Sequence, residues 1–198
     1  MNLFVNKLWV EELSILVNVD GKIDRYGRKR IFKEIYVPQL NKEVAVHLYN
    51  EDSNRLGFYS GINDKIYVNL KGLLICKRDI YETICHEWFH HLQKMGGCNN
   101  KDHCTEEEIQ YFAETKGCWK PGHYLLHSPC EMGAELWTCL LGFRQKHWLS
   151  ISEDTKMLLK KYFREVIIPN KVYLDEWKRI NKKEEMFHAV LDYKKGFK

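Results

Sequence analysis

The segment ICHEWFHHLQKMGG, residues 84–97, holds the side chains best suited to chemistry in this sequence. His86, Glu87 and His90 form the pattern HExxH, and two histidines four residues apart lie on one face of a helix. Both rings can then direct a nitrogen at one Zn²⁺, while the glutamate between them reaches a metal-bound water. A surface helix with incidental histidines is the competing interpretation. The apolar opposite face of the segment favours the metal site.

A catalytic zinc needs a third protein ligand if a water is to keep the fourth position. His91 is not expected to be that ligand, because it lies toward the apolar side of the predicted helix. Gln93 and Gly96 exclude the longer motif in which a third histidine follows on the same segment. Downstream histidines could each complete a three-histidine site, and these are His103, His123 and His127.

The segment SPCEMGAELWTCLLGF, residues 128–143, offers a better third ligand. Its only polar stripe is formed by Glu131, Glu135 and Thr138, and carboxylates on an otherwise buried helix are costly unless they pair or bind a metal. We expect Glu131 to bind the zinc and Glu135, one turn on, to accept a hydrogen bond from a zinc-bound histidine ring. Alternatively, Ser128 and Glu131 form a capping box that closes their own helix end, which leaves Glu135 unexplained.

HEWFH followed by EMGAE resembles the HExxH…ExxA[DEN] arrangement of gluzincin-type zinc metallopeptidases. The order of hairpin, strand, HExxH helix and glutamate helix resembles the small intracellular ImmA/IrrE-like peptidases, over roughly residues 55–143. The resemblance implies that His86, His90 and Glu131 bind zinc, that Glu87 is the general base, and that KIYVNL (65–70) is the edge strand that pairs with substrate. The Cys- and His-rich stretch between the two motifs departs from the family pattern, and the basic C-terminal helices lie outside it.

Several predicted helices and strands must position these residues. Hydrophobic spacing predicts a helix over the first 18 residues, and GRKRIFKEIY (27–36) is predicted as a short helix. Three short strands are expected at 44–50, 55–61 and 65–70. Asp79 and Gly96 are the expected ends of the HExxH helix, residues 98–127 are expected to be irregular, and Ser128 is the expected N-cap of the glutamate helix. Further helices from Glu153 onward should break at Pro169-Asn170.

These elements predict an α+β fold: a small antiparallel sheet packed on the HExxH helix and on the glutamate helix, in a minimal zincin-like arrangement with extra C-terminal helices. We expect a metallopeptidase domain over residues 1–150 and a helical extension over 151–198 packed on it. A hydrophobic content of 44% is that of a globular protein.

Seven cysteines are an odd number, so a complete disulfide framework is excluded. Four potential ligands lie in the stretch that joins the two motifs: Cys98, His103, Cys104 and Cys118. They could hold a second, structural zinc, although their spacing matches no common zinc finger. The alternative is a set of free thiols packed as small hydrophobic groups.

The charge is uneven, because residues 156–198 carry twelve Lys and Arg against six Asp and Glu within a total of +4. This basic end could meet nucleic acid or an acidic partner, or could be a solvated helix face. The apolar runs are too short to cross a bilayer and no secretory signal is recognisable, so an intracellular, cytoplasmic protein is expected. The sequence does not indicate an oligomeric state.

The function predicted from these residues is zinc-dependent hydrolysis of a peptide bond in a protein or peptide, with Glu87 as general base. The oxyanion-stabilising group is open among Tyr111, His123, Tyr124 and His127. The alternative is a non-catalytic zinc-containing interaction module that binds nucleic acid through the basic C-terminal helices. An intact Glu87 favours catalysis, because a structural site needs no general base. Hydrolysis of a non-peptide amide is a third option.

Overall fold

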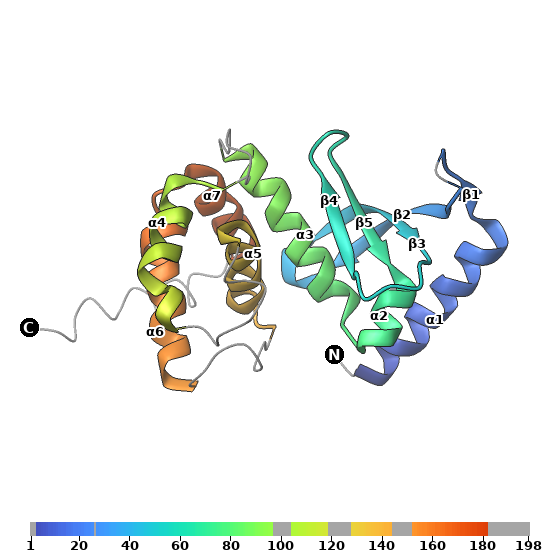
Figure 1. The fold of residues 1–198 in the computed structure, drawn as a ribbon, viewed down its shortest axis with the longest axis horizontal. Coiled ribbons are helices and arrows are strands. Elements are labelled where there is room, and N and C mark those ends of the chain that lie inside the picture. Colours follow the sequence, from blue (N-terminus) through green and yellow to red (C-terminus); the bar gives the residue numbers. More distant parts are fainter. Residues whose placement is uncertain (1–2, 26, 97–103, 119–127, 144–151, 182–198) are drawn as a thin grey trace, which may run out of the picture. The chain divides into compact units, whose positions relative to one another are not determined.

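The computed structural model describes residues 3–25, 27–96, 104–118, 128–143 and 152–181 (Figure 1). The chain divides into two compact units, of which unit 1 contains residues 1–91 and 141–143 and unit 2 the remainder. Helix α3 (Ile80–Met95) runs through the point of division. The domain boundary predicted at residue 150 falls outside the described residues and stays a prediction. No helix among the described residues is both long and apolar enough to cross a membrane.

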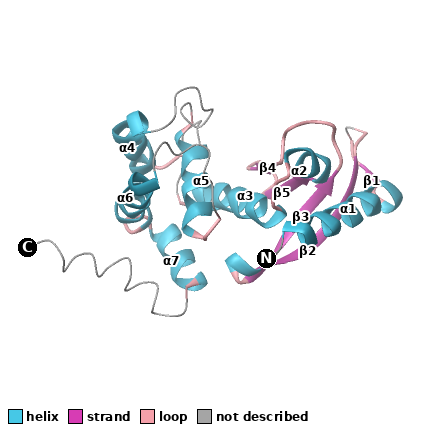
Figure 2. Cartoon of the chain, turned by 90° about the horizontal axis from the view of Figure 1, so that it is seen from below, coloured by secondary structure: helices cyan, strands magenta, loops and turns pink. Residues whose placement is uncertain are grey.

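Unit 1 contains a five-stranded sheet, drawn in magenta in Figure 2, in the order β1-β2-β3-β5-β4. The strands are β1 (Lys22–Ile23), β2 (Lys29–Val37), β3 (Lys42–Tyr49), β4 (Gly57–Ser60) and β5 (Lys65–Asn69). The three predicted strands are confirmed as β3, β4 and β5. The sheet is mixed and not antiparallel as predicted, because β5 returns beside β3 and runs parallel to it. The predicted edge strand KIYVNL is therefore internal, and β4 forms that edge.

The short helix predicted at 27–36 is wrong, since these residues form most of β2. Eight residues of β2 pair in register with β3, from Arg30 opposite Tyr49 to Val37 opposite Lys42. Ile35 and Val37 are buried while Phe32 and Tyr36 are exposed, which is the alternation of a strand with one face in the core. Tertiary pairing thus overrides a sequence that also fits a helix.

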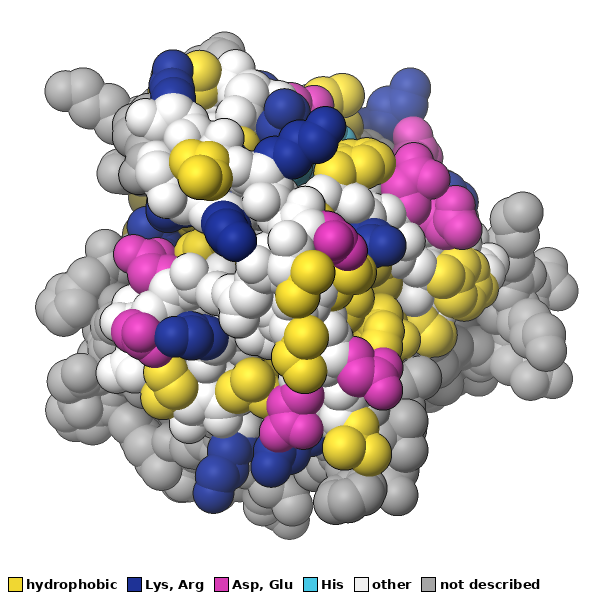
Figure 3. All heavy atoms as spheres, turned by 90° about the vertical axis from the view of Figure 1, so that its right-hand side faces the viewer, with side chains coloured by type: hydrophobic (Ala, Val, Ile, Leu, Met, Phe, Trp, Pro, Cys, Tyr) yellow, Lys and Arg dark blue, Asp and Glu magenta, His cyan; other side chains and the backbone are white. Residues whose placement is uncertain are grey.

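Buried apolar residues form the core on one face of this sheet: Val44, Val46 and Leu48 of β3 with Ile66 and Val68 of β5. Helix α1 (Leu3–Asp20), which the sequence predicted, buries Val10, Leu13 and Val17. Its other side exposes apolar residues, and Figure 3 shows hydrophobic side chains interspersed with charged ones on this side of the molecule. Helix α2 (Leu70–Cys76) follows β5 directly and was not predicted.

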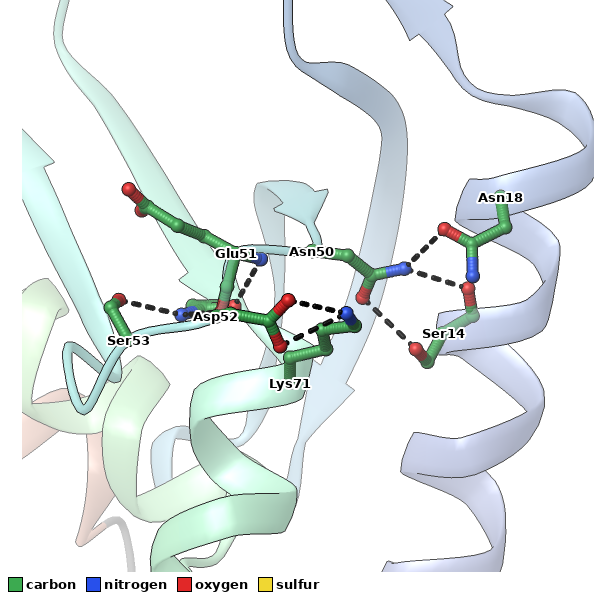
Figure 4. Close-up of polar contacts among 8 residues, drawn as sticks. Ser14, Asn18, Asn50, Glu51, Asp52, Ser53 and Lys71 are labelled. Atoms are coloured by element: carbon green, nitrogen blue, oxygen red, sulfur yellow. Dashed lines mark hydrogen bonds and ion pairs between the residues drawn. The ribbon is translucent and has the colours of Figure 1, made fainter.

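Hydrogen bonds hold the loop that leads from β3 into the edge strand β4 (Figure 4). Asn50 donates to the Ser14 carbonyl at 2.9 Å and to Asn18 Oδ1 at 2.8 Å, which ties the end of β3 to α1. The buried Asn69 accepts from the Glu51 backbone N–H at 3.0 Å and donates to the Arg55 carbonyl at 2.8 Å. Because the loop is fixed at both ends, β4 has a fixed position at the edge of the sheet.

Helix α3 begins and ends where the sequence predicted. Asp79 Oδ1 accepts from the backbone N–H groups of Tyr81 and Glu82 at 2.7 and 3.3 Å, which confirms the N-cap. Beyond the last helical residue, Met95, the Gly96 N–H still bonds to the Leu92 carbonyl at 2.7 Å. Ile84, Cys85, Phe89 and Leu92 are buried along its apolar face.

All regular elements among the described residues of unit 2 are helical. It contains α4 (Glu106–Thr115), a 3₁₀ turn (Lys116–Cys118), α5 (Pro129–Leu140), α6 (Ser152–Tyr162), a π-helical turn (Phe163–Ile167) and α7 (Lys171–Ile180). The break at Pro169-Asn170 is confirmed, with Asn170 Oδ1 capping α7. Helix α4 lies in the stretch expected to be irregular. Its signal was a capping box, because Thr105 and Glu108 each bond to the other's backbone N–H.

Candidate metal centre

The two histidines of HExxH point their Nε2 atoms at each other from successive turns of α3. These atoms are 3.2 Å apart, and the ring planes are inclined by 79°. Two imidazole nitrogens bound to one tetrahedral zinc, each at about 2.0–2.1 Å, would be separated by about 3.3 Å. The observed spacing is therefore already that of a pair of ligands to one ion.

Glu131, at the start of α5, forms a group with the two histidines. One ligand atom from each of His86, His90 and Glu131 lies within 4.8 Å of the other two. All three side chains are half-buried, so the group is reachable by an ion and by water. Among the described residues this is the one cluster of at least three histidine, cysteine or acidic side chains with such geometry. The sequence prediction of these three ligands is thus matched by a group that could hold a metal ion.

Hydrogen bonds inside unit 2 set the register between α3 and α5. Gln93, one turn after His90, donates from Nε2 to the Cys130 carbonyl at 3.0 Å, and Cys130 Sγ donates back to Gln93 Oε1 at 3.1 Å. Cys130 directly precedes Glu131. The contact between Gln93 and Cys130 therefore lies one turn after His90 and one residue before Glu131. It brings the Glu131 carboxylate near the histidine.

A buried carboxylate anchors this contact. Glu108 is 2% exposed and accepts hydrogen bonds from Gln93 Nε2 at 2.7 Å, the Thr105 N–H at 3.0 Å and the Tyr173 hydroxyl at 3.2 Å. Several donors are what a buried charge requires. Glu108 thereby connects α3, α4 and α7. Glu108 is not among the residues predicted from the sequence, although the capping box with Thr105 was a signal for it.

Gly133 of α5 faces the same buried group. A methyl group there would overlap Glu108 Oε1 and would lie 3.0 Å from Gln93 Nε2 and 3.1 Å from the Tyr162 hydroxyl. The lack of a side chain at Gly133 therefore allows α5 to lie close to these groups.

Glu87 lies on α3 between the two histidines and is 6% exposed. Gly57, the first residue of the edge strand β4, sits against it: a Cβ at Gly57 would be 3.3 Å from Glu87 Oε1 and 3.0 Å from Thr83 Cγ2. A glycine inside a short strand often marks such a close approach, and this signal could have identified Gly57 from the sequence. Burial raises the pKa of the neighbouring Tyr49 to about 12, with smaller contributions from Glu51 and Glu87.

The remaining residues of the α5 prediction lie on the expected helix. Ser128 Oγ accepts from the Glu131 N–H at 3.3 Å, so the predicted N-cap is present, while the Glu131 carboxylate belongs to the group that could hold a metal ion. Glu135 is 5% exposed one turn further along. Its hydrogen bond to a histidine ring stays a prediction. His91, not expected to be a ligand, instead contacts Asp64 Oδ1 through Nδ1 at 2.8 Å.

Tyr111 is engaged elsewhere, because its buried hydroxyl donates to the Leu158 carbonyl at 2.8 Å and burial raises its pKa. The other three oxyanion candidates (His123, Tyr124 and His127) lie outside the described residues.

Two members of the predicted second zinc site, Cys98 and His103, also lie outside the described residues. Of its other members, Cys104 is buried beside Cys130 and Cys118 is exposed. The second site stays a prediction.

Comparison of the chain with models of known protein families, with curated proteins and with solved structures finds no match.

Proposed function

We propose that the protein is a zinc-dependent metallopeptidase with a zincin-like active site. The observation that carries the proposal is the grouping of His86, His90 and Glu131, with Glu87 on the same helix as the two histidines. Two neutral imidazoles and one carboxylate are a ligand set used by catalytic zinc, which keeps a fourth position open. Zinc held there would act as a Lewis acid toward a water molecule and a substrate carbonyl.

In this mechanism Glu87 is the group that moves protons. Its carboxylate accepts a proton from the attacking water and delivers it to the leaving amine. Its burial keeps it in a fixed position next to the ligands, and Gly57 leaves room for it beside β4.

An extended peptide is the substrate shape that suits the edge of the sheet. β4 is the last strand in the sheet order, so its outer side has no strand partner among the described residues. A substrate segment can add to such an edge through main-chain hydrogen bonds. Because Gly57 of β4 lies against Glu87, a peptide bound there would pass close to the general base.

Replacement of the general base tests the proposal. We expect the wild-type protein to bind one zinc per chain and to cleave members of a peptide library. Glu87→Gln should retain the zinc, measured by metal analysis, and lose at least about 100-fold in turnover. Glu82→Gln, on the first turn of the same helix, is the matched control and should retain turnover. Wild-type turnover in Glu87→Gln would contradict the assignment, and zinc binding without any turnover would favour a non-catalytic metal module.

A further inference from the structure

Four aromatic rings form a row across the face of the sheet opposite its core. Each comes from a different strand: Phe32 from β2, His47 from β3, Tyr67 from β5 and Phe58 from β4. The strand register places them next to one another, since Phe32 pairs with His47, His47 with Tyr67, and Tyr67 with Phe58. We call these four residues the aromatic row.

The rings of the aromatic row are in contact. Phe58 and Tyr67 stack with centroids 4.5 Å apart and planes 8° apart, and Tyr67 and His47 stack at 5.1 Å. Phe32 meets His47 at 5.6 Å in an edge-on arrangement. Tyr67 is 6% exposed, whereas Phe32 is 57% exposed at the end of the row. The rings therefore form a contiguous stack whose accessible end is Phe32.

Cationic side chains accompany the aromatic row. The Arg55 guanidinium lies 4.5 Å from the centroid of the Phe58 ring, and that of Arg30 lies 5.3 Å from the Tyr67 ring. Burial, and then the charges of Lys65 and Arg30, lower the pKa of His47, so the local field is positive. Arg30 also pairs with Asp24, at 2.7 Å. Arg55 and Lys65 form no ion pair with a carboxylate among the described residues.

Sheet stability explains only part of this arrangement. Cross-strand aromatic pairs stabilise sheets, and the stacked Phe58 and Tyr67 need no other role. That explanation does not cover the exposed Phe32 ring or the cations without carboxylate partners around the row. Aromatic rings on a sheet, bordered by Arg and Lys, are the means by which proteins stack unpaired bases and hold their phosphates.

We propose that the aromatic row binds single-stranded nucleic acid, with a base stacked on the exposed Phe32 ring at its open end and phosphates held by Arg55 and Lys65. The Phe32 ring offers the stacking surface, and the cations supply the charge complementarity. This binding is independent of the metal centre and of the proposed peptidase activity.

Fluorescence anisotropy of the full chain with labelled oligo(dT) and oligo(U) tests the proposal, in chelator to keep the metal centre out of the measurement. We expect Phe32→Ala to weaken binding about 5- to 150-fold, the effect of one lost base stack. Lys65→Glu should weaken binding and reduce the slope of its salt dependence. Tyr36→Ala is the matched control, because Tyr36 is 52% exposed on the same face of β2 but lies outside the row.

Three results would overturn the proposal. The first is absence of binding at tens of micromolar protein in low salt. The second is binding that neither Phe32→Ala nor Lys65→Glu changes, which would assign it to another basic surface. The third is equal affinity for duplex DNA or heparin, since neither presents unpaired bases. Phe32 and Lys65 are both exposed, so thermal melts of the two variants should match the wild type and exclude misfolding.

Discussion

The Glu131 carboxylate has two candidate roles that a single substitution can separate. It stands one turn into α5, where it could serve only the helix end, yet it also lies within 4.8 Å of both histidines. Ser128 already supplies the cap through its hydroxyl, at 3.3 Å from the Glu131 nitrogen. The helix end therefore does not require the Glu131 carboxylate as its cap.

Glu131→Gln keeps the size of the side chain and removes its charge, so we expect zinc affinity to fall by more than about 100-fold, beyond the effect of losing an outer-shell partner. Isothermal titration with a competing chelator measures this. Ser128→Ala is the control: it should cost about 1 kcal/mol of stability through loss of the cap and leave zinc affinity unchanged. Similar zinc affinity in wild type and Glu131→Gln would contradict the ligand role and leave Glu131 only its role at the helix end.

At the scale of elements, the buried group around Glu108 determines how helices of unit 2 meet. Gln93 joins α3 to α5, and Glu108 joins α4 to α3 and α7. Gly133 gives these polar groups their space. The candidate metal ligands on α3 and α5 thus lie next to a hydrogen-bonded cluster that contains none of them.

Gly133→Ala should destabilise the protein by about 1–3 kcal/mol, because the added methyl group overlaps Glu108 Oε1 in a packed interior. Urea unfolding followed by circular dichroism measures the difference. The matched control is Gly117→Ala, where the added Cβ would have nothing within 4 Å. It should change stability by no more than about 0.5 kcal/mol. Equal stability of Gly133→Ala and the wild type would mean that the hydrogen-bonded cluster rearranges around the methyl group at little cost in free energy.

At the scale of the whole molecule, a metal ion would join two helices that are distant in sequence. An ion that binds the folded chain and not the unfolded one stabilises the fold by mass action. His86 and His90 are preset by one helix, but Glu131 takes its place near them only in the folded chain.

Free zinc at about 100 times its dissociation constant should add about 2.7 kcal/mol, which corresponds to a rise in Tm of about 5–10 °C for a chain of this size. Differential scanning fluorimetry with zinc and with chelator measures the shift. Glu131→Gln should show a much smaller one at the same zinc concentration. An identical Tm with zinc and with chelator would argue against a bound ion.

The parts that the sequence determined by itself are those set by neighbours along the chain. The caps at Asp79, Ser128 and Asn170 act within a single helical turn. The HExxH spacing alone places two histidines on one face. Helix periodicity also identified α1, α3 and α5 before any packing was known.

Only the tertiary structure decided the features that depend on distant partners. Residues 29–37 form a strand because β3 pairs with them, and β4 is the edge because β5 inserts beside β3. The proximity of Glu131 to the histidines depends on the hydrogen bond between Gln93 and Cys130, which joins two helices. Local chemistry fixes the conformation of a segment, whereas pairing between segments depends on which buried surfaces and hydrogen-bonding groups meet in the folded chain.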